Sequence, residues 1–474
     1  MKPSLSLIMV LALAFSSCTS DPSGLGKKVE LPLMGNRVIH LAIQSPRTVT
    51  LRAEEQDKDP MEEISSLRFV FYGGASKDKV SHIRELTVQP STTLSDIPLT
   101  LPAEDYRLVV IANATPSLKA STQVGSPLSM LENFTPHRAS DFTTDHPLRL
   151  AMLNSQGAVE ISRTAFSSPT PSVTITLEST LARVLVYGDP TLAGGATKGN
   201  LPPSYIITAQ AKCIAALRPL ALLPNGSMEV PGDGSSPEDR YPKGEYYDTW
   251  LSTPPTKTAG LLSYFDPLSV AINTIEWCAM PTSEPTSNSW KQVRGIYAKE
   301  STIPPTAYLT GTVPTVYLRY PYIPSGLTLT AKEGWLSFQG QYYTETQVKQ
   351  MLQTERYPSE ELKEALTRAG ITSASFTKPF DKEGLAFYYM GISYYTIPIR
   401  HFDNTKAPLK NSIGRYGLVR GNEYRIHITN IQRAGSPLPA KLEDNLTPLS
   451  EEKAHHSALT LAPVITRRSD TELY

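Results

Sequence analysis

The sequence has few of the residue patterns that identify common enzymes and metal proteins. Its 474 residues include only three cysteines, at positions 18, 213 and 278. It has no Cys-x-x-Cys pair, no Gly-x-Ser-x-Gly elbow, no His-Glu-x-x-His motif and no glycine-rich phosphate loop. These absences argue against the redox, hydrolase, metalloprotease and nucleotide-binding classes that depend on them. We therefore expect a protein that is not an enzyme and that holds neither a cofactor nor a metal.

The chain also lacks an excess of either charge. Its 45 basic and 45 acidic residues balance, so composition gives no electrostatic reason to expect a nucleic-acid partner. Two adjacent histidines, His455 and His456, lie near acidic residues, but neighbours on a strand point to opposite faces and make a poor metal site. The four tryptophans can serve a glycan site or, as is more usual, a core. What the chain has in quantity is 40 prolines and 23 tyrosines, which indicate a β-rich protein with many turns.

The first 18 residues have the pattern of an export signal. Lys2 precedes an apolar run from Leu5 to Phe15, and Ser16 and Ser17 come directly before Cys18. The run is too short for a permanent membrane helix and predicts a signal peptide over residues 1–17. The tetrad Phe15-Ser16-Ser17-Cys18 resembles a bacterial lipobox in which Cys18 is the lipidated residue. A plain signal peptide is the alternative. Because one acyl chain is held by about 0.8 kcal/mol per buried CH₂, we expect a tethered protein outside the cytoplasm with no membrane span of its own.

The remaining cysteines, Cys213 and Cys278, allow two interpretations. In an oxidising compartment they can form a disulfide, which would stabilise the fold by about 3 to 4 kcal/mol. Alternatively they are two buried free thiols, because sequence alone does not bring their Cα atoms together.

Short alternating runs separated by turn residues predict a β-sandwich in the first half of the chain. Each run has apolar residues at every second position, so we expect one face to pack inward and the other to meet solvent. The runs are Ser66 to Tyr72, Asp105 to Ile111, Val173 to Leu177 and Ala182 to Tyr187. Together they predict an N-terminal domain over residues 53–190, followed by a Gly/Pro-rich linker over 191–204.

The second half predicts another β-rich domain, over residues 205–455. The expected strands are Ser204 to Ala209, Thr315 to Tyr322, Leu385 to Arg400 and Tyr424 to Asn430, and Pro231 to Pro255 has the composition of a long surface loop. Two helices interrupt the pattern, at Thr344 to Tyr357 and at Ser359 to Ala369, with Ser359 as the N-cap and Gly370 as the stop of the second. Two short helices cannot form an independent core, so we expect an insertion packed on the sandwich.

Several of these segments follow one another in an order that resembles the fimbrillin families of Bacteroidetes. No single motif is decisive, but their order and spacing are fairly specific, and the stretch from Pro231 to Lys378 matches least. The segments that carry the resemblance are Ile64 to Phe71, Leu101 to Tyr106 with Val110 to Asn113, Met152 to Gly157, Leu181 to Val184, Tyr388 to His401 and Tyr416 to Tyr424.

The resemblance implies an all-β fold of two transthyretin-like β-sandwich domains, with the helices as a small insertion in the second. It also implies an assembly chemistry. Such precursors are exported as lipoproteins, and an arginine-specific surface protease removes the lipidated N-terminal segment. Loss of that segment takes a strand out of the first domain, and a strand from the next subunit fills the groove.

The expected cut follows Arg52, with Ala53 as the new N-terminus. A strand-like segment, Val38 to Leu51, precedes it in the propeptide 18–52, and a hydrophilic tract follows it. Arg47 and Arg37 are competing sites. The alternative is that Arg52 stays intact, as in anchor subunits that keep their lipid.

The expected donor strand is the C-terminal tail, residues 456–474. Pro463 and the pair Arg467-Arg468 are departures from an ideal donor, and the alternative is that the tail pairs within its own second domain. Its strand-forming residues are Ala458, Leu459, Thr460, Leu461, Ala462, Val464 and Ile465.

The sequence thus predicts a subunit of cell-surface fimbriae, in an accessory or tip-proximal position that supports adhesion. Its expected partners are other fimbrial subunits, the arginine-specific protease, the outer membrane through the precursor's lipid, and a host or bacterial adhesion ligand. The alternative is a surface lipoprotein that does not polymerise and that anchors fimbriae or binds carbohydrate.

Overall fold

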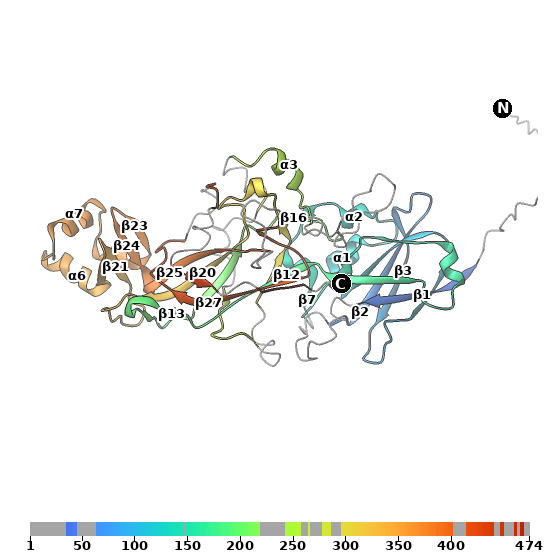
Figure 1. Ribbon diagram of the computed structural model, residues 1–474, viewed down its shortest axis with the longest axis horizontal. Coiled ribbons are helices and arrows are strands. Elements are labelled where there is room, and N and C mark those ends of the chain that lie inside the picture. The colour runs from blue at the N-terminus through green and yellow to red at the C-terminus, as the bar shows by residue number, and fades with distance from the viewer. Residues whose placement is uncertain are drawn as a thin grey trace, which may run out of the picture. The chain divides into compact units, whose positions relative to one another are not determined.

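Figure 1 shows the computed structural model of the chain. The structure describes residues 35–44, 63–145, 148–218, 242–256, 264–265, 277–285, 295–401, 414–439, 446–449, 459–461 and 465–468. Within these ranges strands predominate over helices, which confirms the expected all-β class.

An eight-stranded sheet forms the N-terminal sandwich. Its strands are β1 (Asn36–Gln44), β2 (Ser66–Gly73), β3 (Lys79–Thr87), β4 (Ile97–Pro102), β5 (Tyr106–Ala112), β9 (Met152–Asn154), β10 (Val159–Ile161) and β11 (Val173–Ser179). They follow the order β3-β2-β5-β9-β11-β1-β4, and β10 pairs with β5. The first strand in sequence therefore lies inside the sheet, between β11 and β4.

The central strands of this sheet are buried on both faces, which differs from the expected solvent-facing side. On β2, Phe69 and Phe71 belong to one apolar cluster, whereas Val70 and Tyr72 belong to a second cluster on the opposite face. The second cluster also includes Leu118 and residues around the short helices α1 (Pro116–Ser121) and α2 (Ser129–Glu132). These coverings explain why the central strands are almost continuously apolar.

Two further sheets form the second sandwich. The first contains β12 (Leu181–Tyr187), β13 (Thr191–Leu192), β18 (Ile296–Lys299), β27 (Asn422–Ile431), β28 (Leu459–Leu461) and β29 (Ile465–Arg468). The second contains β14 (Thr197–Lys198), β15 (Ser204–Thr208), β17 (Cys278–Ala279), β20 (Thr315–Ile323) and β25 (Ile392–Pro398). Their facing side chains form one core that includes Val184, Ile426, Val316, Leu318 and Ile397.

The chain passes from the first sandwich to the second at Thr180, before the expected linker over 191–204. Strand β12 pairs in parallel with β27 and antiparallel with β18, so it belongs to the second sandwich although it lies within the expected N-terminal domain. Much of the expected linker contributes strands as well, since β13 and β14 lie in it and β15 begins at Ser204. The sequence predicts β12 in the first domain because it follows β11 directly, and sequence order does not reveal a change of sheet.

The helical insertion has a small sheet and a core of its own. The helices α6 (Glu345–Thr354) and α7 (Glu360–Arg368) lie beside β21 (Trp335–Phe338), β23 (Phe380–Lys382) and β24 (Leu385–Tyr388) in Figure 1, and β22 (Gln341–Thr344) completes that sheet. Thr344 and Ser359 accept hydrogen bonds at the two helix starts, as the sequence predicted for Ser359. Leu336, Val348 and Leu366 are buried in the insertion's own core, so the helices pack on this sheet. The expected continuous strand Leu385 to Arg400 is divided by Met390, whose φ of 55° ends β24 before β25 begins.

A carboxylate fixes the start of α6. Glu333 accepts hydrogen bonds from the backbone and hydroxyl of Thr330, at 2.8 and 2.9 Å, and from the backbone of Thr346, at 3.0 Å. Partial burial alone would raise the pKa of Glu333, but these hydrogen bonds outweigh it and lower the pKa to about 2.

The expected surface loop Pro231 to Pro255 contains a short helix, α3 (Tyr247–Ser252). Trp250 is only 4% exposed and packs in an apolar cluster with Phe265 and Ala307, so this part of the segment contributes to the core. The remaining short strands are β6 (Thr135–Pro136), β7 (Thr143–Asp145), β8 (Leu148–Leu150), β16 (Cys213–Ile214), β19 (Ser301–Thr302) and β26 (Gly417–Leu418). Among the described residues, none of the helices has the length and apolarity needed to cross a membrane.

Candidate functional site

Strand β1 is the feature of the N-terminal sandwich that bears most directly on function. It pairs in parallel with β11 from Leu41 to Gln44 and antiparallel with β4 from Asn36 to Leu41. We call the space between β4 and β11 that it occupies the β1 groove. Among the described strands, β4 is the last of the sheet and pairs only with β1, so β1 is the strand that joins β4 to the rest of the sheet.

The inward face of β1 is part of the hydrophobic core. Ile39 and Leu41 are fully buried and Ile43 is 5% exposed, in the same cluster as Ile97, Leu101, Ile175 and Leu177. Burial of three such side chains is worth about 1.5 to 3 kcal/mol each, so the groove gains about 5 to 9 kcal/mol from them before ordering costs. The period of two along β1 produces this face.

The outward face of β1 is polar at its centre. The His40 imidazole lies 2.7 Å from the Asp96 carboxylate, and the Thr176 hydroxyl donates to the Gln44 side chain at 3.4 Å. Val38 is 41% exposed. A strand that enters this groove therefore needs apolar residues at every second position and tolerates polar ones between them.

Strand β4, which forms one wall of the groove, is also attached to the sandwich by side-chain hydrogen bonds. The Arg84 guanidinium on β3 donates to the Thr100 carbonyl on β4 at 3.1 and 3.0 Å, and the Tyr106 hydroxyl donates to the Pro102 carbonyl at 3.0 Å. These contacts hold β4 to β3 and β5 independently of β1. The structure thus allows the two walls of the groove to stay in place when β1 is absent.

The expected cleavage residues Arg47, Arg52 and Ala53 lie outside the described residues, as does the lipidation residue Cys18. The third arginine, Arg37, lies within β1 opposite Leu101. A cut after Arg37 would leave the three buried residues of β1 attached to the domain. A cut after Arg47 or Arg52 would separate all of β1 from it.

A buried asparagine, Asn113, anchors the chain directly before β2. The Asn113 side-chain oxygen accepts from the backbone and hydroxyl of Ser65, both at 2.9 Å, and its amide donates to the carbonyls of Glu63 and Leu150, also at 2.9 Å. Arg149 pairs with the Glu63 carboxylate at 2.6 Å. From Glu63 onward the domain therefore holds the chain without help from the segment before it.

The C-terminal tail pairs with its own second sandwich, which was the alternative to donation. Strand β28 pairs with β27 at Ile428 to Ile431, and β29 pairs with it at Asn422 to Arg425. Because residues 423 to 425 pair at once with β12 and β29, these two strands lie on opposite edges of β27. The tail thus covers an edge that would otherwise be open.

The structure describes only part of the expected donor segment. Leu459, Thr460 and Leu461 form β28, and Ile465 begins β29. The rest of that set, Ala458, Ala462 and Val464, lies outside the described residues. The assignment of the tail as a donor therefore stays a prediction.

The two cysteines are not paired with each other. Cys213 lies on β16 and Cys278 lies on β17; both are of intermediate exposure, and neither forms a disulfide. His401 is buried, and its ring nitrogen lies 2.8 Å from the Tyr424 hydroxyl. The ring of His427, on β27, stacks on the ring of Tyr187.

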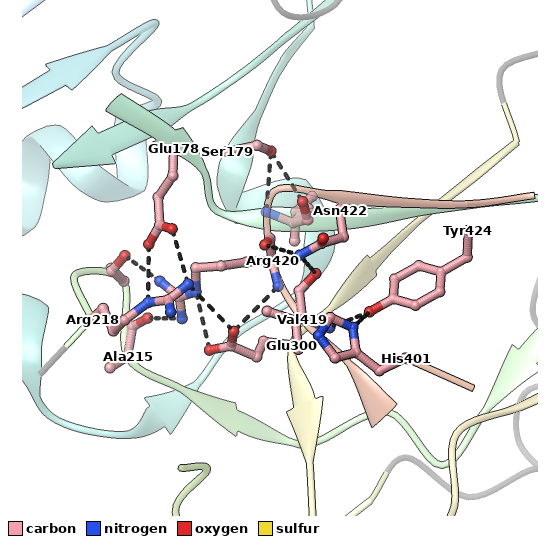
Figure 2. A network of polar contacts seen from close by, with 12 residues as sticks. Glu178, Ser179, Ala215, Arg218, Glu300, His401, Val419, Arg420, Asn422 and Tyr424 are labelled. Atoms are coloured by element: carbon pink, nitrogen blue, oxygen red, sulfur yellow. Dashed lines mark hydrogen bonds and ion pairs between the residues drawn. The ribbon is translucent and has the colours of Figure 1, made fainter. Parts of the chain in front are cut away.

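A buried polar network joins the two sandwiches (Figure 2). Glu178 is the penultimate residue of β11 and accepts two hydrogen bonds from Arg218, at 3.2 and 2.9 Å. Arg218 also lies 4.0 Å from Glu300, which pairs with Arg420 at 3.1 Å. The Arg420 guanidinium continues to the carbonyls of Ala215 and Ala216, at 2.7 and 3.0 Å.

All four charged residues of this network are less than 10% exposed, so each depends on its partners for solvation. Sequence analysis did not identify any of them. A charge within a strand-forming run, such as Glu178 after Leu177, was the available signal.

Comparison with known proteins finds a family match in the C-terminal part of the chain. A family model described as major fimbrial subunit protein type IV, fimbrillin, C-terminal, matches residues 386–461, which run from β24 through β25 and β27 to the end of β28. No curated protein matches the chain.

Solved structures of the same class are similar at low identity. A fimbrilin from Porphyromonas gingivalis W83 is 14% identical, with 85% of this chain and 92% of that chain covered and a TM-score of 0.40. The tip fimbrial protein Mfa3 from Porphyromonas gingivalis with C-terminal truncation is 10% identical, with 92% and 100% covered and a TM-score of 0.38. No functional conclusion follows from likenesses at this level. The resemblance to fimbrillins is nevertheless confirmed over residues 386–461, where the family model for the C-terminal part of major fimbrial subunits matches the chain.

Proposed function

We propose that the chain is a structural subunit of cell-surface fimbriae that polymerises by strand exchange at the β1 groove. It is exported as a precursor lipidated at Cys18, and an arginine-specific protease cuts it after Arg52. The removed segment carries β1, and a strand from a neighbouring subunit takes its place. The position of β1 between β4 and β11, with Ile39 and Leu41 fully buried, is the observation that carries this proposal.

The physical reason for a strong junction is that an empty groove exposes two kinds of unsatisfied surface. The facing edges of β4 and β11 lose their main-chain partners, and the core around Ile97 and Ile175 meets water. An inserted strand restores both, with the hydrogen-bond ladder giving affinity and the alternate side chains fixing the register. The Asn113 contacts support the proposal, because the cut domain keeps its own first strand anchored at Glu63.

The mature N-terminus tests the proposed processing. Mass spectrometry of protein sheared from cells should find Ala53 first. Substitution of both Arg47 and Arg52 by glutamine should leave the lipid-bearing form on the cell and abolish polymers. Polymers that still contain residues 36–44 would contradict strand exchange at this groove.

For the donor we propose the tail, residues 456–474. Donation would break the pairing of β28 and β29 with β27, so the groove must compensate for that loss. Deletion of Ser457 to Tyr474 should remove the subunit from fimbriae while the N-terminal sandwich still folds. Normal incorporation of the deleted protein would show that another segment donates.

The tail also favours a second candidate function. A tail that stays paired with β27 has no strand to give, which suits a surface lipoprotein that keeps β1 and ends or anchors a fimbria, or that binds carbohydrate. Recovery of intact protein that begins at lipidated Cys18 would favour this function. For a processed subunit, an accessory or tip-proximal position is favoured because the segment from Pro231 to Pro314 diverges from the fimbrillin pattern.

A further inference from the structure

A cavity of about 300 Å³ opens on the face of the sheet that contains β15, β20 and β25. Its size is at the lower end of the range for small-molecule sites, which is about 300 to 1,000 Å³. The lining is mainly apolar and aromatic, and Arg319 is the charged residue among the described lining residues. The cavity belongs to the second sandwich, so it shares no residue with the β1 groove.

Arg319 lies in a row of residues that crosses three strands. It is opposite Ser204 of β15 on one side and opposite Tyr394 of β25 on the other. Its Nε donates to the Ser204 hydroxyl, and its guanidinium carbon lies 4.6 Å from the centre of the Trp277 ring. These contacts fix the direction of the guanidinium.

The remaining donors of Arg319 are unused. A guanidinium has five N–H groups, and within the described residues no carboxylate pairs with Arg319 and its two terminal nitrogens make no hydrogen bond. Burial lowers the pKa of Arg319, as expected for a partly desolvated cation without a counter-ion. Other part-buried and buried arginines of this sandwich, including Arg183, Arg420 and Arg425, do face carboxylates.

The aromatic walls beside Arg319 are held in place by stacking. The rings of Tyr394 and Tyr317 are parallel within 8°, with centroids 5.5 Å apart, and Trp277 lies 6.4 Å from Tyr394. On the other side, Tyr389 and Met390 line the cavity from the turn before β25. Met390 has a φ of 55°, a left-handed conformation that non-glycine residues rarely adopt. This turn gives the cavity a wall of fixed shape.

The residue types in the walls favour a sugar over a peptide. Three prolines, Pro202, Pro379 and Pro437, line the cavity and have no N–H to donate to a peptide main chain. Flat aromatic faces suit the C–H faces of a sugar ring, and the tyrosine hydroxyls suit its hydroxyl groups. The planar fork of Arg319 matches a carboxylate.

We propose that this cavity binds an acidic sugar residue of a glycan, with its carboxylate on Arg319 and its ring against Tyr389 and Tyr394. The site gives the subunit a ligand of its own, whether or not strand exchange occurs. Its test is therefore separate from the tests of polymerisation.

The test uses the full-length protein with N-acetylneuraminic acid and D-glucuronic acid as probes, followed by saturation-transfer NMR and calorimetry. Lactose tests a neutral sugar, acetate tests a bare carboxylate, and alanyl-alanine tests a peptide C-terminus. We expect one or both sugar acids to bind more tightly than all three comparison molecules.

Arg319→Gln should weaken binding of the sugar acid about ten- to hundredfold, as expected for loss of hydrogen bonds to a charged group. Arg319→Lys keeps the charge without the fork and should lose less. Arg368→Gln is the matched control, because Arg368 is an exposed residue of α7 with a side chain that is 58% exposed. An unchanged melting temperature for Arg319→Gln would show that the loss is local, and Tyr389→Ala gives a second variant if that protein fails to fold.

Three results would overturn the proposal. One is that neither sugar acid binds. Another is that lactose, acetate or alanyl-alanine binds as well as the sugar acids do, the last of these pointing to a peptide ligand. The third is that folded Arg319→Gln and Tyr389→Ala proteins keep the affinity of the unsubstituted chain.

Discussion

Leu41→Ala should destabilise the uncut N-terminal sandwich strongly. Leu41 is fully buried at the centre of β1 and is opposite Ile97 on β4 and Val173 on β11. Removal of a buried leucine side chain costs about 3 to 5 kcal/mol when the cavity cannot collapse, and two walls fixed by separate contacts hinder collapse. If the same strand is supplied as a separate peptide, that loss corresponds to an affinity at least about a hundredfold weaker.

Hydrogen exchange measures this effect at the groove itself. Amides of β4 and β11 should exchange much faster in the Leu41→Ala protein, because opening of β1 exposes both of its neighbours. Val38→Ala is the matched control, since Val38 is on the same strand but 41% exposed, and it should change stability by no more than about 0.5 kcal/mol. Equal protection of β4 and β11 in the two variants would refute the argument that β1 completes the core.

Three other predictions concern the rest of the chain. Arg218→Ala should lower the free energy of unfolding in urea by about 3 to 5 kcal/mol, because it leaves buried carboxylates without their cation. Lys363→Ala, at an exposed position of α7, should leave the free energy of unfolding nearly unchanged, and equal losses would contradict the role of the network. Reducing agent should leave the melting temperature unchanged because Cys213 and Cys278 form no disulfide with each other, and a drop on reduction would show that they do. The pKa of Glu333 is lowered to about 2, so its contribution to stability is present above pH 4.5 and is lost as the pH falls toward 2. Glu333→Gln should flatten the dependence of stability on pH in that range. An unchanged dependence would refute the stabilising role of the Glu333 carboxylate.

The pattern of the sequence predicted the strands and helix caps well. The alternation around Phe69 and Phe71 and the capping residue Ser359 are local signals, and each led to the element that the structure contains. The resemblance over Tyr388 to His401 falls within the region that the fimbrillin model matches.

Contacts between distant segments were not predictable in the same way. Nothing local to Leu181 to Tyr187 shows that this strand leaves the sheet of β11 and pairs with β27, more than two hundred residues later. The second buried face of β2 depends on coverings from α1 and α2, and the counter-ions of Arg218 and Arg420 come from residues far away in the sequence. Register, sheet membership and buried ion pairs are set by tertiary packing, which a single sequence does not display.

Competition by a peptide tests the central claim most directly. Protein cut by an arginine-specific protease is allowed to polymerise in the presence of a synthetic peptide with the sequence of β1, residues 36–44, or of a scrambled peptide of the same composition. The account predicts that the β1 peptide occupies the groove and stops polymer growth, while the scrambled peptide has no effect. Polymers that grow equally well with the β1 peptide bound would contradict it.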